Sequence, residues 1–305
     1  MFDYDVVIVG GGPAGLTAGL HLGGAGHRTL VLEKELFGGN LKNVDLVENW
    51  PEVPTGTSGD QLASQMAEEA AAAGVRLQEA EVTGIEVFSS TRWVGCDGGR
   101  GYSAAVVVLA TGSRFTRLGI PGEERLLGRG VIDCTPCDGG LFKGRVVAVC
   151  GSDDHALADA LYLAGLADRV TVLTRSLDLR ADAARQERAL AHPRIEVRRG
   201  KSVEAVLGSD RVEGVELSDV ATGRRERLPM DGVVVRVGSE PNTTLLVDVV
   251  ELDDQGWVLS RGADTSAPGV LAAGDVRSGS RARIAAAVRD GTAAARRALD
   301  LLPST

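Results

Sequence analysis

Hydrophobic positions along this chain fall into short runs that alternate with helix-like segments. Apolar runs with the length of buried strands occupy Val6–Val9, Thr29–Leu32, Ala104–Ala110, Arg145–Cys150, Arg169–Leu173 and Gly269–Asp275. Helical patterns occupy Leu16–Leu22, Gly59–Gly74, Leu157–Gly165 and Ala282–Leu301. Strands that alternate with helices indicate parallel sheets. The pattern therefore predicts an α/β protein.

Other stretches lack this alternation. Val75–Thr83 and Gly84–Cys96 predict strands of a small antiparallel layer, and Ile195–Val237 predicts short strands and turns. Arg114–Gly130 is typical of a polar connector. No apolar run reaches the ~20 residues that a membrane helix needs, so no membrane partner is expected.

Composition limits the kinds of partner, the number of domains and the compartment that we expect. The net charge of −9 and a pI near 5.1 argue against nucleic acid or an anionic membrane surface. The length of 305 residues suits about two domains, and 40 glycines suit many tight turns between strands and helices. The chain enters its first strand without a charged leader or cleavage site, so we expect a cytoplasmic protein.

The first glycine turn, residues 10–15, lies between a predicted strand and a predicted helix. Gly10 permits the tight turn, Gly12 lets backbone N–H groups approach a pyrophosphate, and Gly15 lets the helix pack on the strand. The next strand ends at Glu33, which is spaced to accept hydrogen bonds from a ribose diol. This combination predicts a dinucleotide site.

A pair of cysteines, Cys134 and Cys137, stands in the sequence Cys-Thr-Pro-Cys-Asp. Two cysteines at this spacing in a helical turn can close a small disulfide, and the helix N-terminus lowers the pKa of one thiol. Asp138 follows directly and is placed to carry the proton that thiol–disulfide exchange moves. The alternatives are a zinc half-site or two structural cysteines. Zinc normally needs a second close pair of ligands, which favours redox chemistry.

The other cysteines and histidines are scattered along the chain. Cys96 and Cys150 stand alone, and Cys150 ends an apolar run, where a small buried side chain is expected. His155 is either a base near the dithiol or part of a helix cap, and its place in the first helical turn favours the cap.

A second glycine turn, residues 151–156, reads Gly-Ser-Asp-Asp-His-Ala. Asp153 stands where the second glycine of a nucleotide-binding turn belongs, and Asp154 follows it. Two carboxylates at a helix N-terminus satisfy the helix themselves and repel a pyrophosphate. Arg175 and Arg180 could still meet a 2′-phosphate, or they are ordinary surface charges.

Taken together, these motifs resemble the low-molecular-weight thioredoxin reductases over nearly the whole chain. The motifs are the first glycine turn, Glu48-Asn49-Trp50-Pro51, Ala110-Thr111-Gly112, the Cys-x-x-Cys-Asp before the second glycine turn, and Gly274-Asp275. The resemblance implies two Rossmann-like, three-layer ββα domains and a homodimer. It implies an FAD-binding domain formed by residues 1–113 and 243–305, and a central domain of residues 114–242 that carries the dithiol.

The resemblance also implies roles for individual residues. Cys137 faces the isoalloxazine, Cys134 reacts with substrate, and Asp138 is the acid/base. The implied FAD-binding residues are Gly10, Gly12, Pro13, Ala14, Gly15, Glu33, Lys34, Asn40, Asn49, Thr111, Gly112, Gly274, Asp275 and Arg283. Arg283 would stabilise the anionic reduced flavin, although a surface helix charge is the alternative.

The departures from the family pattern fall mainly on the nicotinamide side. Beyond the second glycine turn, the family's His-Arg-Arg-x-x-x-Arg cluster retains only Arg175 and Arg180, and Ala282-Arg283 replaces an Arg-Gln pair. This pattern resembles the dithiol oxidases of the gliotoxin and holomycin pathways, which lack NADPH binding. There a small dithiol reduces the enzyme disulfide, the enzyme dithiol reduces FAD, and dioxygen reoxidises the flavin.

The prediction is therefore an NADPH-independent dithiol oxidase. The alternatives are a thioredoxin reductase, acting on a thioredoxin-like protein and supplied by NADPH or by a ferredoxin, and a flavin-binding protein without turnover. The intact dithiol with its acid disfavours the last.

Overall fold

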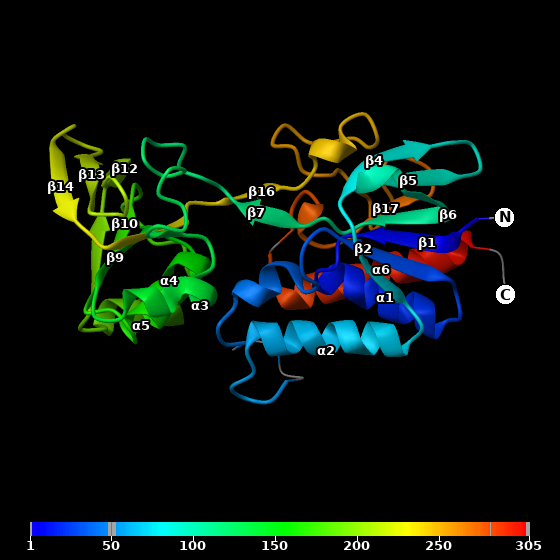
Figure 1. The fold of residues 1–305 in the computed structure, drawn as a ribbon, viewed down its shortest axis with the longest axis horizontal. Helices are drawn as coiled ribbons and strands as arrows, with labels where there is room; N and C mark the ends of the chain where they lie inside the picture. The colour runs from blue at the N-terminus through cyan, green and yellow to red at the C-terminus, as the bar shows by residue number, and fades with distance from the viewer. Residues whose placement is uncertain (1, 48–49, 51–52, 281, 303–305) are drawn as a thin grey trace. The chain divides into compact units, whose positions relative to one another are not determined.

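The computed structural model describes residues 2–47, 50, 53–280 and 282–302 (Figure 1). The chain forms two compact units. Met1–Arg114 and Glu240–Thr305 make up what we call the terminal unit, and Phe115–Ser239 make up the central unit. Strands β7 (Ser113–Phe115) and β16 (Ser239–Pro241) pair with each other and contain both points where the chain passes between the units.

A mostly parallel sheet forms the centre of the terminal unit, in the order β3-β2-β1-β6, with β17 also paired to β6. Strands β5 and β4 extend it in the antiparallel direction. The strands are β1 Tyr4–Val9, β2 Thr29–Glu33, β3 Arg76–Glu79, β4 Val82–Val87, β5 Arg92–Cys96, β6 Gly101–Leu109 and β17 Val270–Ala272. The parallel register places the carboxyl ends of β1, β2, β6 and β17 at one edge, which is where ligands bind to such sheets.

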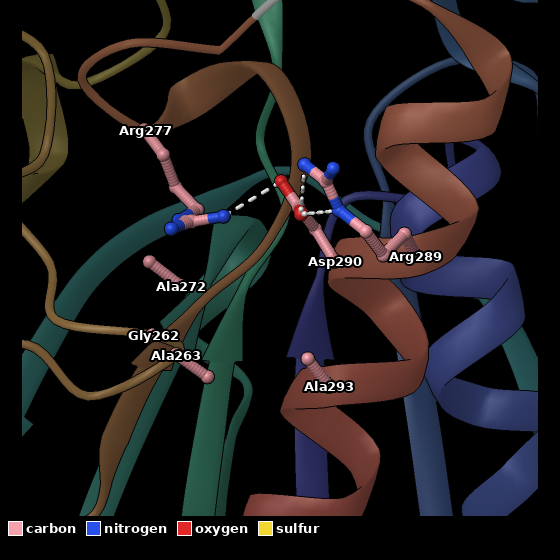
Figure 2. Close-up of a pocket in the computed structure, with 7 residues that line it drawn as sticks. All are labelled: Gly262, Ala263, Ala272, Arg277, Arg289, Asp290 and Ala293. Atoms are coloured by element: carbon pink, nitrogen blue, oxygen red, sulfur yellow. Dashed lines mark hydrogen bonds and ion pairs between the residues drawn. The ribbon is translucent and has the colours of Figure 1, made fainter.

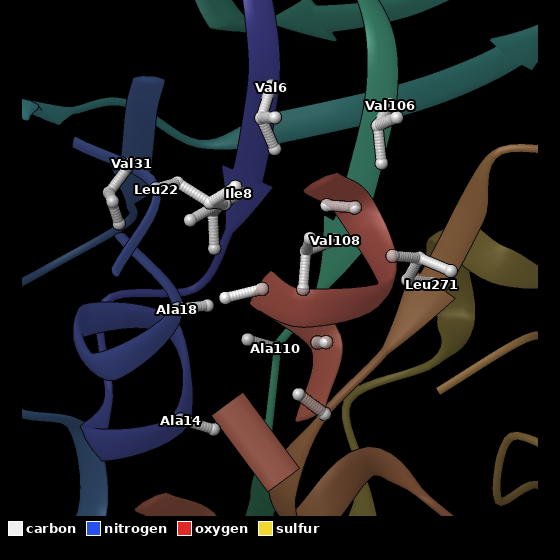
Figure 3. Packing of buried hydrophobic residues seen from close by; sticks show 14 of the residues in the cluster. Val6, Ile8, Ala14, Ala18, Leu22, Val31, Val106, Val108, Ala110 and Leu271 are labelled. Atoms are coloured by element: carbon white, nitrogen blue, oxygen red, sulfur yellow. The ribbon is translucent and has the colours of Figure 1, made fainter. Parts of the chain in front are cut away.

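The helices α1 (Pro13–Gly24), α2 (Gly59–Ala72) and α6 (Ile284–Leu301) lie along one side of this sheet (Figure 1). Because side chains alternate along a strand, Val6 and Ile8 belong to the core beneath the helices (Figure 3). Val7 and Val9 belong to a second core on the opposite face, together with residues of β4 and β5. Both faces are buried, which explains why Val6–Val9 of β1 is continuously apolar.

Helix α6 comes from the far end of the chain and packs closely on α1. A Cβ atom on Gly291 of α6 would overlap the carbonyl group of Ala14 in α1. Glycine is therefore needed here so that the two helix backbones can approach each other.

The central unit repeats this plan. Its parallel sheet has the order β11-β10-β9-β15-β8, and a separate antiparallel sheet has the order β12-β13-β14. The strands are β8 Val131–Ile132, β9 Val146–Gly151, β10 Arg169–Thr174, β11 Ile195–Arg199, β12 Lys201–Leu207, β13 Gly214–Asp219, β14 Arg225–Pro229 and β15 Gly232–Arg236. The helices are α3 Thr135–Asp138, α4 Asp154–Ala164 and α5 Ala183–Ala191. One core lies between the parallel sheet and α4, and another joins this sheet to β12 and β13.

The predicted α/β class with two Rossmann-like, three-layer units is confirmed. The prediction of an antiparallel layer over Val75–Thr83 is wrong for β3, which pairs in parallel with β2, and holds only where Val82 and Thr83 begin β4. Ile195–Val237 contains the predicted short strands and turns, and two of these strands, β11 and β15, belong to the parallel sheet. The pattern also missed α5, whose charged sequence presents only Ala189 as a buried residue.

None of the helices in the described part of the chain is both long and apolar enough to cross a membrane.

We expect Gly291→Ala to lower the free energy of unfolding by about 1–3 kcal/mol, because the new methyl group overpacks the α1–α6 contact. Gly24→Ala at the end of α1 is the control, because nothing lies within 4 Å of its added Cβ. That variant should be neutral or more stable by up to about 1 kcal/mol. Urea unfolding measures both, and equal stabilities would contradict the close packing.

Candidate active site

The first glycine turn connects β1 to α1 and has the conformation that the sequence predicts. Gly10 has φ +109°, and a Cβ atom there would overlap the carbonyl group of Ala110. A Cβ on Gly15 would overlap Gly10 O. Gly39, with φ +52°, brings a second segment of backbone close to Gly12. The turn is therefore a tight backbone cradle.

The N-terminus of α1 is open. Gly12 occupies the N-cap position, no side chain of the described residues caps it, and the first turn contains no acidic residue. A helix start of this kind offers its backbone N–H groups to a phosphate. The Glu33 carboxylate, which the sequence predicts to bind the ribose, accepts a hydrogen bond from Gly11 N at 2.7 Å and is held against the turn. These features fit an FAD pyrophosphate and ribose.

The other predicted FAD residues lie at or near this edge of the sheet. Asn40 Nδ2 donates to Ser113 O at 2.6 Å, next to Gly112. Asp275 follows β17 and accepts a hydrogen bond from Ser280 Oγ at 2.8 Å. Gly274 has φ +76°, and its added Cβ would stand 2.8 Å from Ala14.

Of three further residues predicted to bind FAD, two are exposed and one is not described by the structure. Lys34 is exposed and forms an ion pair with Glu81 at 2.9 Å. Arg283 is exposed at the N-cap position of α6. Asn49 lies outside the described residues.

A residue that the sequence analysis did not assign, Asn242, closes this edge. Its side-chain amide donates to Thr111 O at 2.8 Å, and Thr111 Oγ1 donates back to Asn242 O at 2.9 Å. The motif Pro-Asn-Thr after a predicted turn was the available signal.

The terminal unit also contains a cavity of about 270 Å³ between α6 and β17 (Figure 2). Its buried acid, Asp290, is balanced by Arg277 at 2.7 Å and Arg289 at 3.2 Å. None of the residues predicted to bind FAD lines this cavity.

In the central unit, Cys134 and Cys137 form a disulfide across the short helix α3, with their Cα atoms 5.3 Å apart. Cys134 is the N-cap residue, and its sulfur accepts a hydrogen bond from Cys137 N at 3.2 Å. Cys137 is exposed, whereas Cys134 and Asp138 are half-buried. No cluster of three or more His, Cys, Asp or Glu side chains in the described part of the chain could hold a metal ion.

The second glycine turn, between β9 and α4, is closed by its own carboxylate. Gly151 has φ +155°, and an added Cβ would overlap Arg236 O, so this turn is as tight as the first. Asp153 caps α4 by accepting a hydrogen bond from Ala156 N at 3.0 Å. The predicted self-capping is thus observed for Asp153, and it supplies the negative charge that α1 leaves to a ligand.

The segment after β10 folds back over this turn. Ser152 O accepts hydrogen bonds from the backbone N–H groups of Arg180 and Ala181, at 2.7 and 3.1 Å. Asp154 accepts from Asp182 N at 2.8 Å and pairs with Arg185 at 3.1 Å. Arg180 Nε also donates to Ser152 Oγ at 3.2 Å. One of the two arginines that the family pattern retains is therefore bound to the turn itself.

Arg236, which the sequence analysis did not identify, lies beside Gly151 at the carboxyl end of β15. Its guanidinium is 4.1 Å from the centre of the Phe115 ring, and this ring meets the His155 ring edge-on at 5.5 Å. The predicted cap role of His155 is wrong, because Asp153 is the cap and the imidazole packs on Phe115. A single arginine that ends an apolar strand was the only sequence signal.

Cys96 and Cys150 are buried thiols. Burial raises the pKa of Cys150 to about 12 and also raises the pKa of Cys96. Cys150 is a small side chain in the core around β9, as predicted.

After reduction of the native protein, iodoacetamide at mildly alkaline pH should label Cys134 and Cys137 and leave Cys96 and Cys150 unmodified, because only a thiolate reacts. Peptide mass spectrometry measures the labelling, and the denatured protein, in which all four cysteines should react, is the control. Labelling of Cys150 in the native state would contradict its burial.

Comparison with known proteins agrees with this geometry. Residues 4–291 match the family described as pyridine nucleotide-disulphide oxidoreductase. The thioredoxin reductase of Treponema pallidum is 41% identical over 298 residues, which cover 96% of this chain and 95% of that protein.

Solved structures give the same result and confirm the predicted low-molecular-weight thioredoxin reductase architecture. The thioredoxin reductase of Lactococcus lactis matches with a TM-score of 0.95 and 33% identity, over 98% of this chain and 99% of that one. The thioredoxin reductase of T. acidophilum matches with a TM-score of 0.93 and 32% identity, over 97% and 98%. This chain belongs to the pyridine nucleotide-disulphide oxidoreductase family, and it is an FAD-dependent flavoprotein.

Proposed function

We propose that this chain oxidises a small-molecule dithiol to a disulfide through Cys134 and Cys137, with dioxygen as the final acceptor and without NADPH. The observation that carries the proposal is the contrast between the two glycine turns. The N-terminus of α1 follows a glycine, and no side chain of the described residues caps it, whereas the N-terminus of α4 is capped by the carboxylate of Asp153. A pyrophosphate at the second turn would have to displace this cap and approach two carboxylates.

Two further features support the exclusion of a nicotinamide nucleotide. Nucleotides bind outside the carboxyl ends of parallel strands. At this edge the Phe115 ring carries the Arg236 guanidinium over its face and meets the His155 ring edge-on. Arg180 is held by Ser152, which leaves only Arg175 of the family's arginine cluster for a 2′-phosphate.

The chain's own residues suffice for the thiol chemistry. A substrate thiolate attacks Cys134 Sγ, the bond between the two sulfurs breaks, and Cys137 leaves as a thiolate. The second substrate thiolate then attacks the substrate sulfur bound to Cys134, which releases the substrate disulfide and the enzyme dithiol. Asp138 carries the proton in these exchanges.

Bound FAD would accept the electron pair from this dithiol and deliver it, with two protons, to dioxygen. Each cycle therefore converts one dithiol and one dioxygen into one disulfide and one hydrogen peroxide.

A second candidate is a thioredoxin reductase that is supplied by NADPH or by a ferredoxin. The names of the relatives favour it, since the proteins at 41% and 33% identity are thioredoxin reductases. A thioredoxin-like protein would then replace the small dithiol.

The proposal includes the remaining assignments made from the sequence. Residues 1–113 and 243–305 would bind FAD, residues 114–242 would carry the dithiol, and the chain would act as a cytoplasmic homodimer. Its net charge of −9 gives no support for nucleic acid as a partner.

Anaerobic titration of the holoprotein separates the candidates. We expect a small dithiol such as dithiothreitol to bleach the visible flavin band and air to restore it, with hydrogen peroxide formed. NADPH should not bleach the band, because the second turn excludes it. Prompt stoichiometric bleaching by NADPH would contradict the proposal and support the NADPH-dependent reductase. If neither reagent bleached the flavin band, a ferredoxin would be indicated as the electron donor.

Cys134→Ser is the matched control for this titration. It should retain FAD and lose bleaching by the dithiol, because no disulfide can form. If the variant turned over normally, the dithiol mechanism would be wrong.

Asp153→Gly tests the exclusion directly. We expect about tenfold tighter NADPH binding, equivalent to about 1.4 kcal/mol, because a carboxylate is removed from the phosphate position. Helix stability should change by only a few tenths of a kcal/mol. Asp210→Gly removes an exposed carboxylate elsewhere in the central unit and is the control. Equal NADPH affinity in both variants would show that Asp153 does not exclude the nucleotide.

A further inference from the structure

A buried ion pair lies next to the disulfide in the central unit. Arg236 Nε is 2.7 Å from Asp159 Oδ2, and the two side chains are 2% and 12% exposed. Asp159 comes from α4 and Arg236 from the end of β15, so the pair joins the helix layer to the sheet. Water screens such a pair little, and its geometry is fixed by the packing around it.

The arginine of this pair is hydrogen-bonded to the backbone of the residue that precedes Cys134. Arg236 Nη2 donates to Asp133 O at 2.7 Å, and Nη1 donates to Val235 O at 2.8 Å. The planar guanidinium can serve the carboxylate and this backbone carbonyl together, which a lysine ammonium on its flexible stem would do less rigidly.

The acid of the pair faces the residue between the cysteines. Thr135 is fully buried, and its hydroxyl has no partner at hydrogen-bonding geometry among the described residues. The hydroxyl lies near the carboxyl group of Asp159 and acts to lower its pKa. Burial nevertheless raises the pKa of Asp159 overall, and the charge of Arg236 opposes this rise.

We propose that the Asp159–Arg236 pair is a positioning device for the Cys134–Cys137 couple: Arg236 holds the backbone before Cys134 through Asp133 O, Asp159 faces the buried Thr135 that follows it, and the pair so sets the reduction potential of the disulfide. The proposal rests on the redox role of this couple, but not on the identity of the electron donor or acceptor.

The physical reason is the effective concentration of the two thiols. A rigid turn keeps the sulfurs close and favours the disulfide over the dithiol, whereas a loosened turn favours the open dithiol. Stability alone does not explain the pair, since replacing a buried ion pair by apolar side chains is often neutral or stabilising. A positioning role explains why two charges are kept beside a redox centre.

Arg236→Met tests the proposal in the holoprotein. It keeps much of the side-chain volume and removes the contacts to Asp133 O and Asp159. We expect about a tenfold fall in effective concentration, which raises the reduction potential by about 30 mV for this two-electron couple. Anaerobic equilibration in dithiothreitol buffers, followed by alkylation and mass spectrometry of the peptide with both cysteines, measures the potential.

Arg194→Met is the matched control. Arg194 also binds backbone carbonyls in the central unit, those of Ala164 and Ala167 at 3.4 and 3.2 Å, and among the described residues none of its side-chain hydrogen bonds goes to the dithiol segment. This variant should lose stability without a change in potential. If the potentials of both variants equal that of the wild type, or shift equally, the positioning role is overturned.

Two more variants test the same proposal if Arg236→Met folds poorly. Arg236→Met with Asp159→Leu replaces the pair by apolar side chains and should recover stability while the potential stays shifted. Thr135→Val removes only the hydroxyl and should shift the potential in the same direction by less. A wild-type potential in the double variant would mean that the pair acts on stability alone. Because the measurement uses neither NADPH nor dioxygen, its result is independent of which electron route is correct.

Discussion

A helix leaves its first backbone N–H groups without partners, and the two units of this chain satisfy that constraint in opposite ways. Helix α1 follows a glycine turn and is left uncapped by the described side chains, while α4 follows an equally tight turn and is capped by Asp153. The same local architecture therefore leaves one turn open to a phosphate and closes the other with a carboxylate. In the function proposed above, this difference determines which nucleotide the chain holds.

The open turn depends on parts of the chain that are far apart in sequence. Parallel register brings the ends of β1, β2, β6 and β17 to one edge. The residues at or just after these ends are Gly10, Glu33, Thr111 and Gly274. Helix α6 completes the arrangement by packing on α1 at Gly291. An FAD-binding unit made from both ends of the chain is consistent with this topology, and the family to which the chain belongs uses this cofactor.

The closed turn and the disulfide share a network in the central unit. The turn begins at Gly151, whose strand partner Arg236 also binds Asp133 O beside Cys134. The charge of Arg236 is balanced by Asp159 and covered by Phe115. Under the two proposals made above, the side chains beside the second glycine turn both exclude a nucleotide and position the disulfide, so the two properties would share one structural basis.

The sequence by itself determined the features that depend on neighbouring residues. Apolar runs predicted the parallel strands β1, β2, β6, β9, β10 and β17, although not β3, β8, β11 and β15. Asp153 could be recognised as a cap because a cap bonds within its own helical turn. The spacing of Cys134 and Cys137 similarly allowed their disulfide to be foreseen. Tertiary structure decided the rest. The contacts of Arg236 with Asp159 and Phe115 form only because the fold brings β15, α4 and β7 together. Likewise, β3 is parallel because it pairs with β2 in the folded sheet. Such contacts join residues far apart in the chain, and no local pattern of polarity records them.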